Sequence, residues 1–261
     1  METTENASRT PVIDEGKEFV ETLMSSRPSR LTACQGWTVH EITAHLAAGS
    51  QEIADLIENH LAGNAPRATR PFDEREAPFR AMDDRLLRSL LFEQVERAKR
   101  ARDRLTAHAE DVVMFTGRPM HAAEFVTHSR SERALHRWDI VGRDEVGWGM
   151  LTQPELTVHA ISILTEMPVL AETFENRLRT AKHPFKDFLV VLRSEPYDDV
   201  IVSRVNGVLD VRTESLQDRR VDAYLEPATR LLALWGRGEP STAIHLARGA
   251  NLDALGSLFG W

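Results

Sequence analysis

The stretch from Trp37 to Gly49, WTVHEITAHLAAG, begins a long helix and contains two histidines. Thr38 followed three residues later by Glu41 forms a capping box, in which each side chain bonds the backbone N–H of the other residue. His40 and His45 are five positions apart, so they point roughly 140° apart around the helix axis. The HExxH motif of zinc proteases needs histidines four positions apart, so that both bind one metal ion. We therefore interpret Glu41 as a capping residue and His40 as a bystander, and look for the partner of His45 elsewhere in the chain.

Apolar residues at spacings of three and four predict helices through the first two-thirds of the chain. The expected helical segments are 12–25, 38–62, 82–108, 120–141 and 154–182, the last interrupted near Pro168. Proline and charge dominate residues 63–78, which predicts a loop, and TGRP at 116–119 predicts a turn.

The character of the chain then changes from helical to β-rich. Strands are predicted at 187–194, 199–205 and 208–213, and Asn206-Gly207 between the last two is a strong hairpin signal. Two helical segments follow, at 224–235 and 251–259. The predicted fold class is therefore α+β. A helical bundle in residues 1–183 precedes a small α+β domain in residues 184–261, with the boundary near His183-Pro184.

Composition excludes several classes of protein. The 261 residues have a formal net charge of −8 and no dense basic block, which argues against nucleic-acid binding. Mean hydropathy is −0.34, no apolar run reaches the length of a membrane span, and the polar N-terminus lacks a secretory signal, so we expect a cytoplasmic protein without membrane contact. A single cysteine, Cys34, excludes an intramolecular disulfide and any cysteine-rich zinc site. We interpret Cys34 as a buried small residue rather than a nucleophile.

The segment 120–141 has a narrow stripe of potential metal ligands. They recur every three or four residues along one helix face: His121, Glu124, His128, Glu132 and His136. Arginines occupy the opposite side, so the stripe is expected to face the protein interior. Glu124/His128 and Glu132/His136 each have the spacing that can hold one metal ion, with His45 as a natural third ligand from a facing helix. Two imidazoles and one carboxylate suit Zn²⁺, and also Ni²⁺ or Fe²⁺. Residue types alone do not choose between the two pairs.

Three segments resemble elements of the mycothiol-dependent maleylpyruvate isomerase family, which belongs to the DinB-like metalloenzyme superfamily. Residues 34–49 resemble its GWTV…HLA element, and residues 132–140, ERALHRWDI, resemble its ExxxHxWD element. Residues 231–237, LLALWGR, resemble the LLxLWGR element of its second domain, which is similar to sterol carrier proteins. The resemblance implies a DinB-like bundle in which His45, Glu132 and His136 bind a divalent metal. Glu124 and His128 would then line the site or form hydrogen bonds around it.

The resemblance also implies a reaction. A metal-bound thiol favours its thiolate form, which is the nucleophile, so mycothiol would be the cosubstrate for attack on an electrophilic small molecule. The outcome is either S-transfer or cis–trans isomerisation, and neither the electrophile nor the oligomeric state, monomer or homodimer, follows from the motifs. Asp139 is expected to orient a ligand or to form a salt bridge. Arg237 is predicted to be catalytic, as an anion contact from the second domain, with a helix cap as the alternative.

Two other functions are compatible with such a metal site. A non-catalytic small-molecule-binding module would use the metal structurally and would close its coordination shell with protein ligands. A metal-dependent hydrolase would activate water and would turn over esters or amides without a thiol. No GxSxG, P-loop or GxGxxG motif supports serine-hydrolase, NTPase or dinucleotide chemistry.

Overall fold

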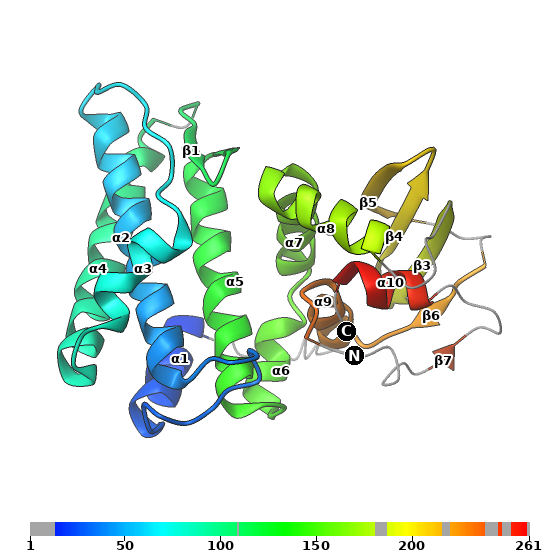
Figure 1. The fold of residues 1–261 in the computed structure, drawn as a ribbon, viewed down its shortest axis with the longest axis horizontal. Helices are drawn as coiled ribbons and strands as arrows, with labels where there is room; N and C mark the ends of the chain where they lie inside the picture. Colours follow the sequence, from blue (N-terminus) through cyan, green and yellow to red (C-terminus); the bar gives the residue numbers. More distant parts are fainter. Residues whose placement is uncertain are drawn as a thin grey trace, which may run out of the picture.

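The computed structural model describes residues 14–108, 110–180, 187–215, 220–237, 245–246 and 252–259. Helices fill one end of the molecule and a β-sheet fills the other, with α7 (Pro154–Glu166) and α9 (Pro227–Leu234) between them (Figure 1). The predicted α+β fold class is confirmed. The predicted domain boundary at 183–184 lies outside the described residues and stays a prediction.

The helical end is a bundle of long helices. α2 (Val39–Leu61) packs along α4 (Asp84–Thr106), and α5 (Ala122–Val141) contacts both of them (Figure 1). The short α1 (Glu15–Ser25) packs against α5, and the part of the predicted helix before residue 14 lies outside the described residues.

The predicted ends of the two helices that carry the candidate ligands are confirmed. Before α2, the backbone N–H of Thr38 donates to Glu41 Oε2 at 2.5 Å, and the Glu41 N–H donates to the Thr38 hydroxyl, which completes the capping box. α5 ends at Gly142, whose φ of 78° suits a residue without a Cβ. Both ends are therefore fixed by local sequence.

One predicted loop is partly wrong. Residues 72–80 form the helix α3 (Phe72–Arg80), which packs against α2. Pro71 at the N-cap and acidic residues in the first turn favour this start. The helix lacks an apolar stripe because it buries Arg75 and Glu76 as well as Phe79, and hydrophobic periodicity could not reveal it.

The turn predicted at TGRP is confirmed. It joins the short strands β1 (Val113–Phe115) and β2 (Arg118–Met120), with Thr116 and Gly117 both at positive φ. Between α5 and α7 lies α6 (Glu145–Leu151), which was not predicted because two glycines weaken its helical signal. The break near Pro168 separates α7 from α8 (Pro168–Thr180).

The sheet has the strand order β5-β4-β3-β6-β7. β3 (Phe188–Ser194), β4 (Tyr197–Val205) and β5 (Val208–Glu214) form an antiparallel meander, and the predicted hairpin at Asn206-Gly207 has both residues at positive φ. β6 (Ala223–Tyr224) and β7 (His245–Leu246) were not predicted. β6 occupies the start of the predicted helix 224–235, which begins instead at Pro227. The final helix is α10 (Leu252–Phe259).

Helix α5 is packed on several sides. Phe125 belongs to an apolar core with α2, α4 and β1, Ile140 to a second core with α1 and α2, and Leu135 to a third core. The third core also contains buried residues of α7, α8, α9, α10 and the sheet. Because α5 touches three cores, no single apolar face dominates its sequence. No helix in the described part of the chain is long and apolar enough to span a membrane.

Candidate metal centre

Helices α2 and α5 bring the three candidate ligands together. His45 Nε2 lies 3.2 Å from Glu132 Oε2, and His136 Nε2 lies 3.4 Å from the same oxygen. One ligand atom from each of these residues lies within 4.8 Å of the other two. Among the residues that the structure describes, no other group of three or more histidine, cysteine or acidic side chains is arranged in this way.

The Nδ1 atom of each histidine forms a hydrogen bond with a buried carboxylate. His45 Nδ1 lies 2.7 Å from Glu76 Oε1, and His136 Nδ1 lies 2.9 Å from Asp139 Oδ2. Burial favours the neutral form of both acids, but hydrogen bonds from the histidines outweigh it and lower the pKa of Glu76 and of Asp139. An ionised carboxylate only accepts, so each Nδ1 carries a hydrogen.

The donor set fits a cation. With Nδ1 protonated, a neutral imidazole has its lone pair on Nε2, and the Nε2 atoms of both histidines lie within 3.4 Å of Glu132 Oε2. Three acceptors that converge repel one another unless protons or a metal ion lie between them. Burial opposes ionisation of Glu132, but hydrogen bonds with His136 and His45 hold its pKa well below the usual range. The site is thus anionic and suited to a divalent metal, with carboxylate–histidine pairs of the kind that support zinc.

Aromatic rings cover the two histidines. The Trp37 ring is stacked on His136 with centroids 6.3 Å apart, and it lies 5.2 Å from the His45 ring. Phe72 of α3 also stacks on His45, with centroids 5.9 Å apart and an interplanar angle of 19°. The side chain of Glu132 remains 22% exposed, so the centre is open on the carboxylate side.

The alternative pair, Glu124 and His128, has other partners. Glu124 accepts from the backbone of His121 at 2.8 Å, as part of the N-terminal cap of α5, and forms an ion pair with Arg118. His128 Nδ1 lies 3.2 Å from His159 Nε2 of α7. Burial lowers the pKa of both histidines, to about 3 for His159, so this pair stays uncharged near neutral pH.

Arg237 reaches the site through Asp139. Its guanidinium Nε and Nη2 donate to the two oxygens of Asp139 at 2.8 and 3.0 Å. The carboxylate of Asp139 therefore forms both a hydrogen bond with His136 and an ion pair with Arg237. Cys34 is half-buried, and burial together with the negative charge of Asp139 raises its thiol pKa.

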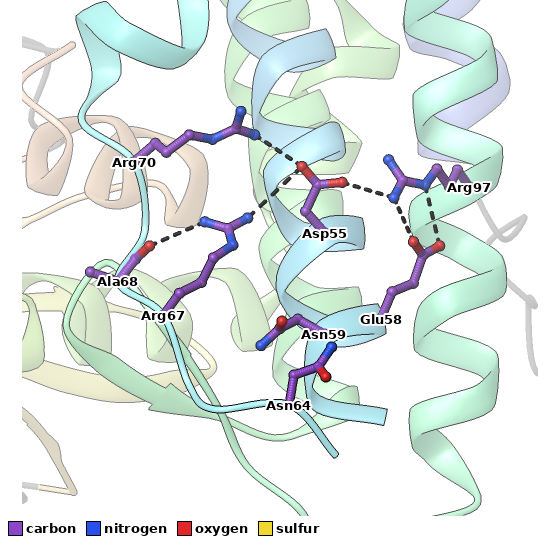
Figure 2. Close-up of a pocket in the computed structure, with 8 residues that line it drawn as sticks. All are labelled: Asp55, Glu58, Asn59, Asn64, Arg67, Ala68, Arg70 and Arg97. Atoms are coloured by element: carbon purple, nitrogen blue, oxygen red, sulfur yellow. Dashed lines mark hydrogen bonds and ion pairs between the residues drawn. The ribbon is translucent and has the colours of Figure 1, made fainter. Parts of the chain in front are cut away.

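Away from the three ligands, a surface pocket opens between α2, α4 and the segment before α3 (Figure 2). Its charged groups pair with one another: Arg97 contacts Asp55 and Glu58, while Arg67 and Arg70 contact Asp55. No predicted site residue lines it. The pocket is an ion-pair network, not the candidate centre.

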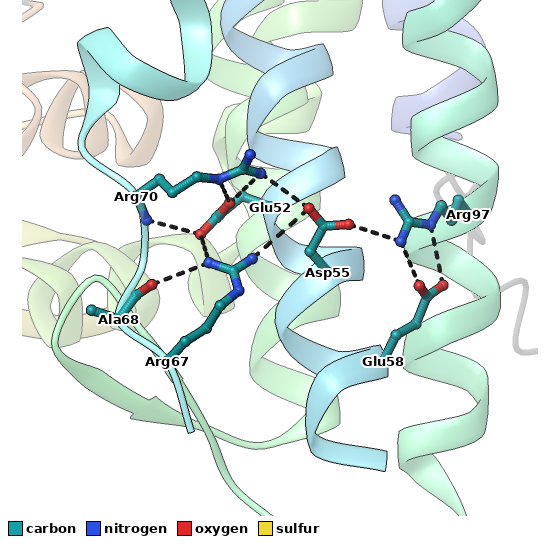
Figure 3. Close-up of polar contacts among 7 residues, drawn as sticks. All are labelled: Glu52, Asp55, Glu58, Arg67, Ala68, Arg70 and Arg97. Carbon is teal, nitrogen blue, oxygen red and sulfur yellow. Dashed lines mark hydrogen bonds and ion pairs between the residues drawn. The ribbon is translucent and has the colours of Figure 1, made fainter. Parts of the chain in front are cut away.

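That network nevertheless positions α3. The fully buried carboxylate of Glu52 accepts from Arg67 at 2.7 Å, from Arg70 Nε at 2.6 Å and from the Arg70 backbone at 2.9 Å (Figure 3). These bonds fix the segment that leads into α3 against α2. Phe72 and Glu76 are thereby held beside His45.

Comparison with known proteins identifies the family of this chain. The sequence profile described as the mycothiol maleylpyruvate isomerase N-terminal domain matches residues 10–141, which is half of the chain. The chain belongs to the mycothiol maleylpyruvate isomerase family. No curated protein matches its sequence.

Two solved structures share the fold of this family member. They are the crystal structures of the mycothiol-dependent maleylpyruvate isomerase and of a histidine-to-alanine mutant, with TM-scores of 0.57 and 0.56. Each is 18% identical in sequence, and each alignment covers 88% of this chain and 87% of the other. The likeness therefore extends through the helical bundle and the sheet.

The sequence interpretation missed Glu76, Arg75 and Phe72, which all lie on α3. A run of alternating charges after a proline was the only signal there, and it is equally typical of a loop. The acidic first turn after Pro71 could have suggested a helix.

Proposed function

We propose that this family member is a divalent-metal-dependent enzyme that uses mycothiol as a thiol cosubstrate against an electrophilic small molecule. The observation that supports this most is the convergence of His45, Glu132 and His136, whose ligand atoms lie within 4.8 Å of one another. Zinc fits this donor set best, and nickel or iron are compatible with it. A divalent ion held by these residues would lower the pKa of a bound thiol and so supply the nucleophile.

The surrounding residues have distinct tasks in this proposal. Glu76 and Asp139 fix the tautomer and the direction of the two imidazoles, so both Nε2 atoms are available as ligands. Trp37 and Phe72 pack against the histidine rings and so limit their contact with water. The exposed side of Glu132 leaves room for a thiol, as an open catalytic site requires and a closed structural site does not.

Arg237 is proposed to act through Asp139. It was predicted as an anion contact, but its guanidinium is bidentate on that carboxylate, so its charge is already neutralised. Its role is then to keep Asp139 ionised and directed at His136. Arg237 is a positioning residue in this account.

Elemental analysis with mycothiol calorimetry tests the proposal. Purified protein should contain near-stoichiometric metal and bind mycothiol, while His45→Ala and His136→Ala should lose both. His60→Ala is the matched control, since it removes a histidine at the far end of α2 that pairs with Asp111. Metal retained in both ligand variants would contradict the ligand set, and metal without mycothiol binding would favour a structural or hydrolytic site.

The two reaction types differ in whether the mycothiol sulfur stays attached to the product. Candidate electrophiles incubated with mycothiol and the metal-loaded protein can be analysed by mass spectrometry. A product that retains the thiol indicates transfer, and an isomerised product with mycothiol fully recovered indicates cis–trans isomerisation.

A further inference from the structure

Arg75 of α3 is a buried cation without a contacting anion. Its side chain is 5% exposed, and among the residues that the structure describes its guanidinium has no hydrogen-bond or ion-pair partner. The other buried arginines in the described part of the chain each have a hydrogen-bond acceptor: Arg88, Arg118 and Arg137 pair with acidic side chains, Arg102 donates to the Ser129 hydroxyl and Arg230 to the Asp198 carbonyl. An uncompensated buried guanidinium is costly, so it needs an explanation.

The position of Arg75 links it to the metal centre. Its guanidinium carbon lies 4.2 Å from the centroid of the Phe72 ring, and the same ring stacks on His45 with centroids 5.9 Å apart. Arg75 is therefore one aromatic ring away from a candidate ligand. Phe72 itself is 48% exposed, so part of its ring is open to solvent.

The nearby carboxylates have other partners. Burial lowers the pKa of Arg75. The negative charges of Glu76, Glu52 and Glu132 oppose this shift, although none of these carboxylates contacts the Arg75 guanidinium. Glu52 is bound by Arg67 and Arg70, as Figure 3 shows, and Glu76 is bound by His45 and Arg80. Glu132 is committed to the two histidines.

The local charge then favours an anion. A divalent ion and Arg75 together carry three positive charges against the single charge of Glu132, since Glu76 and Asp139 are balanced by Arg80 and Arg237. A guanidinium offers a planar pair of donors that matches a carboxylate. The exposed ring of Phe72 lies where the carbon skeleton of a small acid would rest.

We propose that Arg75 binds a carboxylate of the electrophilic substrate and so selects acidic small molecules. This inference rests on the proposed function, because it places the carboxylate beside the metal-activated thiol. The electrophile is thus held with one end on Arg75 and its apolar part on Phe72.

Binding of maleate to the full-length, zinc-loaded protein tests the inference, with the uncharged diamide of maleic acid as the comparison ligand. Calorimetry should show that Arg75→Gln weakens maleate binding at least tenfold and leaves diamide binding unchanged. Arg75→Lys should recover part of the affinity, because it keeps the charge but not the paired donors. Arg97→Gln is the matched control, since it removes a distant arginine that already has carboxylate partners, and it should bind maleate as the wild type does.

Metal content, mycothiol affinity and melting temperature are measured on the same samples. All three should be unchanged in Arg75→Gln, since a structural arginine would lower the melting temperature when replaced. Equal maleate binding by wild type and Arg75→Gln would overturn the inference about Arg75. A loss of maleate binding that accompanies a lower melting temperature would overturn it too. Neither result would affect the proposed function. Weaker mycothiol binding with unchanged maleate binding would also overturn the inference, because the anion would then belong to the thiol. Wild type without metal or mycothiol binding would overturn the proposed function itself.

Discussion

Each of the two histidines of the candidate centre is supported by a series of polar contacts, which we call a relay. The two relays differ in the residue at which they end. The first relay runs from His45 to Glu76 and then to Arg80, which lies one turn further along α3. The second relay runs from His136 to Asp139 and then to Arg237, a residue 98 positions away in the C-terminal part of the chain. Both carboxylates are buried, at 1% and 0% side-chain exposure.

The difference between the relays lies in their last residue. Arg80 is 37% exposed, so water can replace its charge, whereas Arg237 is 17% exposed and bidentate. The first relay is a local property of the bundle. The second makes the position of His136 depend on Arg237, which follows α9, so it couples the candidate centre to the C-terminal region.

The largest expected effect comes from Asp139→Asn. This change removes the negative charge that His136 and Arg237 share and leaves the largely buried Arg237 without a counter-charge, which should lower the free energy of unfolding by about 3 kcal/mol. Loss of the carboxylate behind a metal ligand should also weaken metal binding, by about 100-fold. Chemical denaturation and competition with a chelator measure the two quantities. An unchanged metal affinity would show that the second relay does not support the centre.

Glu76→Gln should have a smaller effect on the same two measurements. The amide oxygen can still accept from His45, and Arg80 can be hydrated, so we expect metal affinity to fall by about tenfold. The loss of stability should stay within about 1 kcal/mol, because the outer ion pair is partly exposed. Equal or larger losses than in Asp139→Asn would reverse the ranking of the two relays.

The fold was largely predictable because its local signals are strong. The capping box at Thr38, the end of α5 at Gly142 and the hairpin at Asn206-Gly207 each depend on a few adjacent residues, and all are confirmed. α3 was missed because its burial is polar. Its Glu76 completes the first relay, so half of the support for the centre was invisible to hydrophobic periodicity.

The centre itself needed more than periodicity. Within α5, spacing alone gave two equivalent pairs, and family resemblance favoured Glu132/His136. His45 and Glu132 are 87 positions apart, so only the packing of α2 on α5 shows that they meet. The structure brings the predicted trio together, while its binding of metal stays a prediction.

The first relay also predicts how metal binding depends on pH. Burial disfavours protonated His45, but hydrogen bonds with Glu132 and Glu76 outweigh this and raise its pKa from 6.5 to about 9. In the metal-free protein the resulting stability is fully present below pH 6.5 and is lost as the pH rises through about 9. Metal must displace that proton, so apparent affinity should fall by about tenfold per pH unit below this pKa. Calorimetry in buffers of different ionisation enthalpy should detect about one proton released at pH 7.5, and less in Glu76→Gln.

Arg237→Gln and Arg80→Gln compare the ends of the relays. The first should lower the free energy of unfolding by about 2 kcal/mol, because Asp139 keeps its charge with one partner fewer. The second should cost less than about 1 kcal/mol, as an exposed pair does. Denaturant titration measures both, and an equal cost would remove the distinction between a local and a long-range relay.

The smallest effect is expected at Cys34, which lies in the electrostatic field of the second relay. Its raised pKa makes its thiolate scarce near neutral pH, so Cys34→Ser should leave metal content and mycothiol affinity unchanged. Slow alkylation by iodoacetamide would agree with this. Rapid alkylation together with lost thiol binding in Cys34→Ser would assign the cysteine a role in the reaction.

Spectroscopy of the cobalt-substituted protein tests whether the His45–Glu132–His136 centre binds a metal and the thiol, because Co²⁺ occupies zinc sites and reports the atoms bound to it. We expect visible bands of a low-coordinate site that disappear in His136→Ala. Addition of mycothiol should produce a sulfur-to-metal charge-transfer band. A spectrum that does not change when mycothiol is added, or that is the same in His136→Ala as in wild type, would contradict thiol activation at the His45–Glu132–His136 centre.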